Sequence, residues 1–177
     1  MEYKIDIYKT DEGNTLRYAL GKNGKKPLVV IGLNPSTADE HNTDKTIEKV
    51  MGIADGAILD GFIMLNLYPQ RTPKLPYYLD LQLNTKYHEK NLEIIKEVLF
   101  GMNDIQVLVA YGDNIVKLNR PYLKQCMKEI VSVISKFNPR WLKTGDLTQL
   151  GHPRNPLFVK YIEGLTEFDM ETYLSKI

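Results

Sequence analysis

Two asparagines and a histidine are the residues of this sequence that are best placed to do chemistry. Asn34 comes directly after the apolar run at 28–33 and precedes Pro35, in the segment GLNPS. An amide both donates and accepts hydrogen bonds, so Asn34 can hold a water molecule or a carbonyl group, although it cannot take a proton at ordinary pH. Gly32 permits close backbone approach, and Pro35 fixes the turn so that the amide points into a cleft. The alternative is an Asn-Pro turn whose side chain caps its own backbone.

Asn66 and His152 are the other two candidates. Asn66 ends the apolar run at 62–67, where a polar side chain must find a partner, and the edge of a nucleobase can supply one. The alternative is a turn-forming asparagine. His152 lies in GHPRNPLF, between glycine and two prolines, where a neutral imidazole can donate to a developing anion. The alternative is an exposed loop histidine.

Several familiar motifs are missing from the sequence. The loop after the first apolar run, GLNPST, has one glycine where a dinucleotide-binding loop needs three. We find no phosphate-cradling loop that ends in Gly-Lys-Ser/Thr and no nucleophile elbow around a serine. The histidines never occur as an i, i+4 pair, and the segment 39–41 (DEH) lacks metal-ligand spacing. We therefore expect neither a metal nor a cofactor.

Apolar patterning predicts the elements that must position these residues. Runs at 28–33, 62–67, 105–111 and, more weakly, 141–147 indicate buried strands, and segments of helical spacing lie between them. This alternation predicts a three-layer α/β fold with a mostly parallel, four-stranded central sheet and helices on both faces. Residues 3–8 and 16–20 predict an N-terminal β-hairpin, and residues 167–175 a short final helix.

In such sheets ligands bind beyond the carboxyl ends of the strands. Asn34, Pro35 and Ser36 follow the first predicted core strand, Asn66 ends the second, and the His152 loop follows the fourth. The topology therefore predicts that these polar groups converge on one site.

Length and composition favour one ordinary globular domain. The chain has 177 residues, of which 43% are hydrophobic and 25% charged. We expect a single α/β domain over 1–177, divided into a hairpin at 1–26, a core at 27–158 and a C-terminal extension at 159–177. No apolar run approaches the roughly 18 residues of a membrane span, and the N-terminus lacks a secretory pattern, so no membrane partner is expected. The single cysteine, Cys126, favours a reducing, cytoplasmic setting.

Charge is distributed unevenly along the chain. The formal net charge is +1, yet the segment Lys117–Arg154 holds eight basic residues against two acidic ones. Such a segment can meet the phosphate backbone of a nucleic acid or a nucleotide. The alternative is a solvated helix face. The oligomeric state is left open.

Taken together, these segments resemble an uncharacterised bacterial and phage family, domain of unknown function 1643. The resemblance covers residues 16–158 in the expected order, through the segments LRYAL, IGLNPSTAD, TDKTIEKV, NLYPQRTPKL, AYGDN and GHPRNPLF.

A more distant resemblance links IGLNPS, IMLNL, VLVAYG and GHPRNPLF to the uracil-DNA glycosylase superfamily. It implies that Asn34 positions the attacking water, that Asn66 reads the base edge and that His152 binds the base oxygen. It also implies that Leu157 wedges into a duplex when a base is flipped out. Asn34 stands where the fastest members carry aspartate, although mismatch-type members also use asparagine. The aromatic residue that stacks on the base just after the first motif is missing, since Ser36 and Thr37 occupy its place.

This resemblance implies a nucleobase-handling protein that hydrolyses an N-glycosidic bond in nucleic acid or a nucleotide. One alternative is a non-catalytic module that binds a nucleotide or a modified base. Another is a different small-molecule hydrolase or transferase that uses the same pocket, with Arg71 and Arg154 as a phosphate clamp. For Arg71 the structural alternative is a loop arginine packed over neighbouring carbonyl groups. The substrate base is left open.

Overall fold

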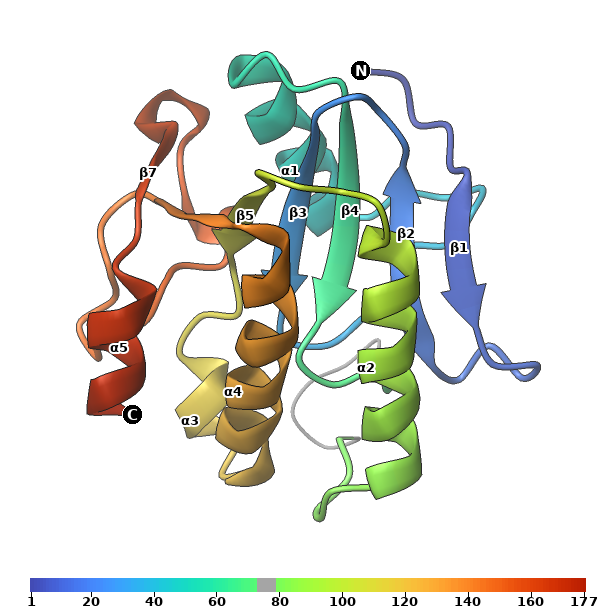
Figure 1. Ribbon diagram of the computed structural model, residues 1–177, viewed down its shortest axis with the longest axis vertical. Helices are drawn as coiled ribbons and strands as arrows, with labels where there is room; N and C mark the ends of the chain where they lie inside the picture. Colours follow the sequence, from blue (N-terminus) through green and yellow to red (C-terminus); the bar gives the residue numbers. More distant parts are fainter. Residues whose placement is uncertain (73–78) are drawn as a thin grey trace.

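One mixed β-sheet runs through the centre of the fold in the computed structural model, which describes residues 1–72 and 79–177 (Figure 1). The strands found in these residues lie in the order β1-β2-β4-β3-β5-β6-β7. Their bounds are β1 Ile7–Thr10, β2 Arg17–Lys22, β3 Pro27–Gly32, β4 Gly61–Asn66, β5 Gln106–Val109, β6 Arg140–Thr144 and β7 Leu165–Glu167.

Parallel pairing joins the strands at the middle of the sheet. β3 pairs with β4 on one side and with β5 on the other, and β5 pairs with β6. Antiparallel pairs extend the sheet on both sides, β1 with β2 and β2 with β4 at one side and β6 with β7 at the other. The prediction of an α/β fold is confirmed, but the sheet is mixed and larger than the four strands predicted.

The additional strands come from the two ends of the chain. β1 and β2 form the antiparallel pair expected near the N-terminus, although they begin at Ile7 and Arg17 rather than at residues 3 and 16. The hairpin joins the main sheet because Leu20, Gly21 and Lys22 pair with β4. β7 has only three residues, which are too few to give an alternating pattern, so the sequence did not indicate it.

Helices cover both faces of the sheet because the central strands alternate in what they bury. Leu28 and Val30 of β3 pack with α1, Lys45–Gly56, whereas Val29 and Ile31 pack on the opposite face. That opposite face is covered by α2, Thr85–Leu99, and α4, Tyr122–Ile134. Figure 1 shows α2 and α4 in front of the sheet and α1 behind it. The chain also forms α3 Asn114–Lys117, α5 Met170–Lys176 and the short 3-10 turns Ser135–Phe137, Pro156–Phe158 and Tyr161–Glu163.

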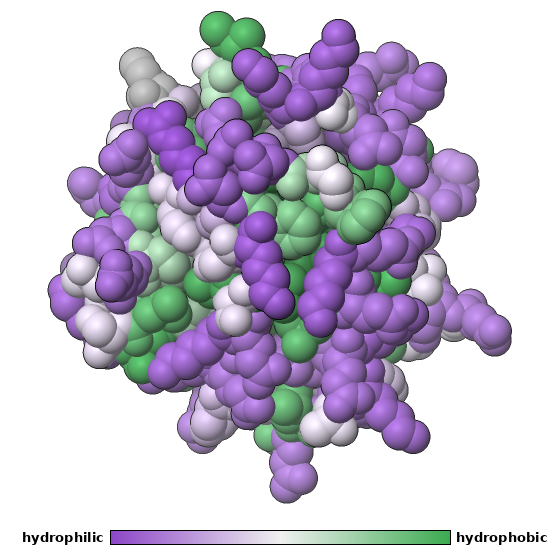
Figure 2. Space-filling model, viewed as in Figure 1, coloured by the Kyte–Doolittle hydropathy of each residue, from purple (hydrophilic) through white to green (hydrophobic). Residues whose placement is uncertain are grey.

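The outer surface over α2 and α4 is mostly hydrophilic. Hydrophilic side chains cover most of this face, and apolar surface shows only in small separated areas (Figure 2). Scattered apolar residues of this kind are normal on a protein surface and do not mark a docking site. Within residues 1–72 and 79–177, no helix combines the length and the apolar character needed to cross a membrane.

The contact between β2 and β4 requires a residue without a side chain. A Cβ atom added at Gly21 would lie 2.4 Å from the carbonyl oxygen of Phe62, which belongs to the backbone of the neighbouring strand. We expect Gly21→Ala to lower the free energy of unfolding by about 2 kcal/mol or more, because overpacking against backbone cannot be relieved by a side-chain rotation. Urea denaturation of the purified variant measures this change.

Gly56→Ala is the matched control. Gly56 is the last residue of α1, and an added Cβ would meet no atom within 4 Å. The same substitution should therefore be neutral or stabilise by up to about 1 kcal/mol. Equal destabilisation by the two variants would show that close approach at Gly21 is not what joins the hairpin to the sheet.

Candidate functional site

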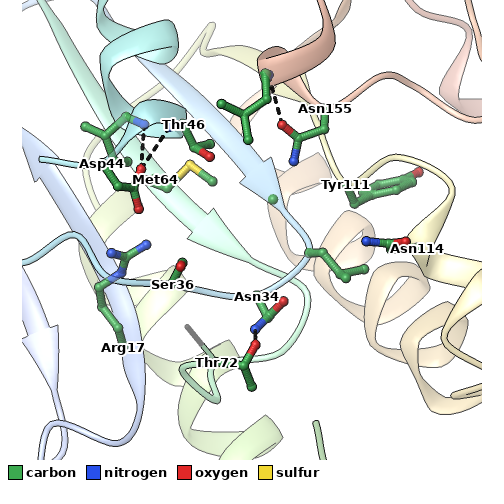
Figure 3. A pocket seen from close by; sticks show the side chains of 14 residues that line it. Arg17, Asn34, Ser36, Asp44, Thr46, Met64, Thr72, Tyr111, Asn114 and Asn155 are labelled. Atoms are coloured by element: carbon green, nitrogen blue, oxygen red, sulfur yellow. Dashed lines mark hydrogen bonds between the residues drawn. The ribbon is translucent and has the colours of Figure 1, made fainter. Parts of the chain in front are cut away.

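A cleft lies beyond the carboxyl ends of β3, β4 and β5, as the topology predicts for an open α/β sheet. Its volume is about 230 Å³. This is below the roughly 300–1,000 Å³ of sites for drug-sized ligands, so one base fills most of the cleft and a larger ligand extends out of it. We call it the strand-end cleft. Figure 3 shows the polar side chains around it, among them Arg17, Asn34, Ser36, Asp44 and Asn155.

Asn34 is held rigidly at the edge of this cleft. Its Nδ2 donates to Thr72 Oγ1 at 2.7 Å, to the carbonyl oxygen of Gln70 at 3.1 Å and to that of Pro35 at 3.2 Å. Both amide hydrogens are therefore turned toward the protein. Among the described residues no donor reaches Oδ1, so this oxygen remains as an acceptor for a water molecule or a ligand in the cleft.

Asn155 lines the wall of the cleft opposite Asn34 and is oriented the other way, with its oxygen turned toward the protein. Its Oδ1 accepts from the backbone N–H of Leu157 at 3.0 Å, which orients the amide and leaves Nδ2 as a donor on the cleft side (Figure 3). The sequence prediction missed Asn155 as a site residue. The signal was present, because Asn155-Pro156 repeats the Asn-Pro pattern of Asn34-Pro35 in a second loop.

Arg17 is a second residue that the sequence prediction missed. It begins β2, lines the strand-end cleft and is only 2% exposed. Its Nη1 donates to the carbonyl oxygen of Ala38 at 2.7 Å, while its buried Nε has no partner among the described groups. Burial lowers its pKa to about 10, and the nearby Arg71 acts in the same direction, yet Arg17 stays charged at neutral pH. The sequence signal that could have identified Arg17 is its position as a basic residue between Leu16 and Tyr18 in an alternating segment.

Gly32 lies at the floor of the cleft, and Asn66 lies beneath it. They are paired across β3 and β4, and a Cβ added at Gly32 would lie 2.9 Å from Asn66 Oδ1 and 2.4 Å from Met64 Cε. The space beside Gly32 is thus filled by these two side chains. Asn66 is fully buried, and neither of its amide atoms has a hydrogen-bond partner among the described protein groups. Asn66 therefore lies directly beneath the cleft and is not part of its lining.

His152 does not line the strand-end cleft. It is 5% exposed, its Nδ1 lies 2.7 Å from the hydroxyl oxygen of Tyr173, and the two rings meet edge to face. Burial lowers the pKa of His152 below its ordinary value of 6.5; Asp113 opposes this shift and Lys124 adds to it. The structure thus brings Asn34 and Asn66 to one place and sets His152 behind it, against α5.

A larger cavity of about 540 Å³ adjoins the cleft. The two share Tyr111, Asn114 and Asn155, and the larger one is also bordered by Arg154 and Phe158. The ring of Tyr111 borders the cleft, while its hydroxyl points away from it (Figure 3). Tyr111 is thus an aromatic residue at the site, although it lies two residues after the end of β5 and not in the first motif.

The remaining predicted site residues are dispersed around these cavities. Ser36 and Leu157 line the strand-end cleft, and Leu157 is 39% exposed. Pro35 lies buried in the turn and accepts the backbone N–H of Thr72 through its carbonyl oxygen.

Arg71 and Arg154 do not face one ligand. Arg71 Nη2 donates to the carbonyl oxygens of Thr37 and Ala38, and its Nη1 lies within hydrogen-bonding distance of Tyr8 and Asn14, beside a separate cavity. Arg154 Nε donates to the carbonyl oxygen of Asp146 and lines the adjoining cavity. Arg71 is thus an arginine packed over carbonyl groups.

The basic segment Lys117–Arg154 does not form one continuous stripe. Lys117 pairs with Asp113 and borders the adjoining cavity, whereas Arg140 pairs with Glu167 at the opposite end of the sheet. A phosphate backbone would therefore meet only part of this segment. In the portion of the chain that the structure describes, no three His, Cys, Asp or Glu side chains are grouped to hold a metal ion.

Comparison with known protein families shows which family the chain belongs to. The model of a protein family of unknown function, DUF1643, matches residues 17–157, which is most of the chain. The chain belongs to DUF1643. The matched range begins at Arg17 and ends at Leu157, so every residue that lines the strand-end cleft lies within it. Neither the curated proteins nor the solved structures gave a match.

The orientations of the Asn34 and Asn155 amides in this DUF1643 protein can be tested by replacing each asparagine separately with aspartate. Asn34→Asp would turn a carboxylate oxygen toward the carbonyl groups of Pro35 and Gln70, which cannot donate. We expect it to lower the free energy of unfolding at neutral pH by about 1–3 kcal/mol, since buried acceptors are left unpaired. Asn155→Asp keeps an acceptor for the Leu157 N–H and should change stability by less than about 0.5 kcal/mol. Equal losses in urea denaturation would contradict these orientations.

Burial of His152 predicts a pH dependence of stability. Because its folded pKa is depressed, the unfolded chain takes up a proton on this residue at a higher pH than the folded protein does. The stability that neutral His152 contributes is full above pH 6.5, and it is lost as the pH falls through the folded pKa. We expect acidification from about pH 8 to about pH 5 to destabilise the wild type more than His152→Gln in urea denaturation. His41→Gln, at an exposed histidine, should behave as the wild type.

Proposed function

We propose that the strand-end cleft binds a nucleobase and that the protein hydrolyses the N-glycosidic bond that carries this base. The observation that supports this most is the pair of fixed amides with opposite polarity, an acceptor at Asn34 Oδ1 and a donor at Asn155 Nδ2. Nucleobases present donors and acceptors along one planar edge, so such a pair suits them. The resemblance of IGLNPS and GHPRNPLF to uracil-DNA glycosylase motifs favours the same reaction, and the likeness of fold stays a prediction.

In the proposed reaction Asn34 holds the attacking water. Its Oδ1 accepts one hydrogen of the water, which turns the water oxygen toward the sugar carbon C1′. The C1′–N bond breaks with its electron pair on the base, the water oxygen bonds to C1′, and the released proton ends on the base nitrogen. Asn34 takes up no proton itself, because an amide is not basic at ordinary pH. Its contribution is the position of the nucleophile.

Asn155 is the proposed donor to the departing base. Negative charge develops on the base as the glycosidic bond breaks, and a pre-oriented N–H stabilises that charge without reorganising. Asn155 thus takes the role that the resemblance gave to His152, which lies outside the cleft. The ring of Tyr111 and the apolar side chains of Leu33 and Met64 supply surface against which a planar base packs.

A non-catalytic binding module is the second candidate. The placement of His152 favours it, since the one histidine expected to stabilise the departing base is held against Tyr173 and does not line the cleft. Such a module would keep both amides and bind a base or nucleotide without turnover.

A base-release assay tests the proposal. Oligonucleotides with uracil, hypoxanthine or an alkylated base, single- and double-stranded, and the matching nucleosides and nucleotides are incubated with the protein, and free base is quantified. We expect Asn34→Ala to reduce release about 100-fold, because the water is no longer positioned. We expect a similar loss in Asn155→Ala, because one donor to the anion is removed.

Asn103→Ala is the matched control for this assay. Asn103 is exposed and lies beyond the opposite ends of the strands, beside the start of β5. Its removal should leave base release unchanged. Release that persists in both cleft variants would contradict the proposal, and ligand-dependent stabilisation without release from any substrate would favour the binding module.

A further inference from the structure

We propose that Arg17 binds a phosphate group of the ligand, so that the strand-end cleft takes phosphorylated nucleotides in preference to free bases or nucleosides. The phosphate site itself stands on Arg17 and its surroundings. The nucleotide part rests on the function proposed above.

Arg17 is a buried cation without an anionic partner in the described structure. It is 98% buried, yet no carboxylate among the described residues lies within 4.0 Å of its guanidinium. One hydrogen bond is formed, from Nη1 to the carbonyl oxygen of Ala38 at 2.7 Å, and Nε has no partner in this part of the chain. A buried charge destabilises a fold unless it is paired and hydrogen-bonded. An anion bound in the cleft would supply that pairing.

The neighbouring Arg71 adds to this effect, and the carboxylate of Asp44 opposes it. Arg71 Nη2 donates to the same carbonyl oxygen of Ala38, at 3.2 Å. The nearby carboxylate of Asp44 is already engaged, since Oδ1 accepts the N–H groups of Thr46 and Ile47 and Oδ2 accepts that of Ala38. Asp44 therefore offsets part of the charge of Arg17 from a distance, but it forms no direct ion pair with the guanidinium.

Phosphate fits the groups at this end of the cleft. A guanidinium presents parallel N–H groups that grip phosphate oxygens in a bidentate manner. The hydroxyl group of Ser36 lies beside Arg17 and that of Thr46 lines the cleft beyond Asp44 (Figure 3). Neither hydroxyl is used as a donor in a hydrogen bond among the described residues. Asn155 lies on the far side. The cleft therefore has an anion end at Arg17 and a base end between Asn34 and Asn155.

The experiment compares matched ligands with and without a phosphate. Binding of a nucleoside, its 5′-monophosphate, inorganic phosphate and a short oligonucleotide is measured by calorimetric titration of the wild type, Arg17→Met and Arg140→Met. We expect the wild type to bind the monophosphate at least about tenfold more tightly than the nucleoside, because the phosphate forms a charged hydrogen bond with Arg17. In Arg17→Met this ratio should fall to about one, while Arg140→Met, an exposed arginine at the other end of the sheet, should keep the wild-type ratio.

Thermal denaturation without ligand separates this role from a structural one. Arg17→Met removes a buried unpaired charge at similar volume, and Arg71 still donates to Ala38, so the melting temperature should be unchanged or higher. A large fall would indicate that Arg17 serves the fold. Arg17→Lys, which keeps the positive charge without the planar guanidinium, should then retain part of the wild-type ratio, and a ratio of about one in that variant would overturn the proposal.

The remaining outcomes separate this proposal from the proposed function. A monophosphate-to-nucleoside ratio of about one in the wild type overturns the phosphate site even where base release is observed. Binding of inorganic phosphate that is lost in Arg17→Met, together with no binding of any nucleoside or base, supports the phosphate site and contradicts the nucleobase function. Arg17-dependent binding of the oligonucleotide alone supports the site and assigns the phosphate to a nucleic-acid strand.

Discussion

The position of β3 between two parallel neighbours is the constraint on which the site depends. Because β4 and β5 both run in the same direction as β3, the loops after three strands meet at one edge. Backbone bonds continue past the strand ends, from Leu67 N–H to Gly32 and from Thr72 N–H to Pro35. The loops after β3 and β4 therefore form one hydrogen-bonded unit, and the side chain of Asn34 is placed by that unit.

The two cleft amides show how backbone partners decide the polarity of a site. Carbonyl oxygens can only accept, so Asn34 must turn Nδ2 toward Gln70 and Pro35. A backbone N–H can only donate, so Asn155 must turn Oδ1 toward Leu157. Each amide is thus oriented before a ligand arrives, and little conformational entropy is left to be lost on binding. An aspartate at position 34 would meet the same carbonyl groups, which gives a structural reason for an amide there.

Much of the fold could be predicted from the sequence, because buried parallel strands leave unbroken apolar runs. The runs at 28–33 and 62–67 correspond to β3 and β4, and helical spacing located α1, α2 and α4. The size of the sheet could not be predicted, since pairing between β2 and β4 depends on a close approach at Gly21. Within the site, Asn34 was found because it follows a strand. His152 lies behind the cleft because its loop packs against Tyr173, a contact across 21 residues that no local pattern encodes.

Arg17 illustrates why charge is the hardest site property to read from a sequence. Its neighbours Leu16 and Tyr18 are buried, and the alternation of a strand places an arginine between them on the opposite face. In the structure the loop at 36–38 and the start of α1 cover that side, and Arg17 is enclosed with them. The amides of Asn34 and Asn155 cannot take up a proton, so any hydrolysis there must depend on stabilising charge on the departing base more than on activating water. Arg17 lies along the same cleft, and its positive charge favours anionic ligands there.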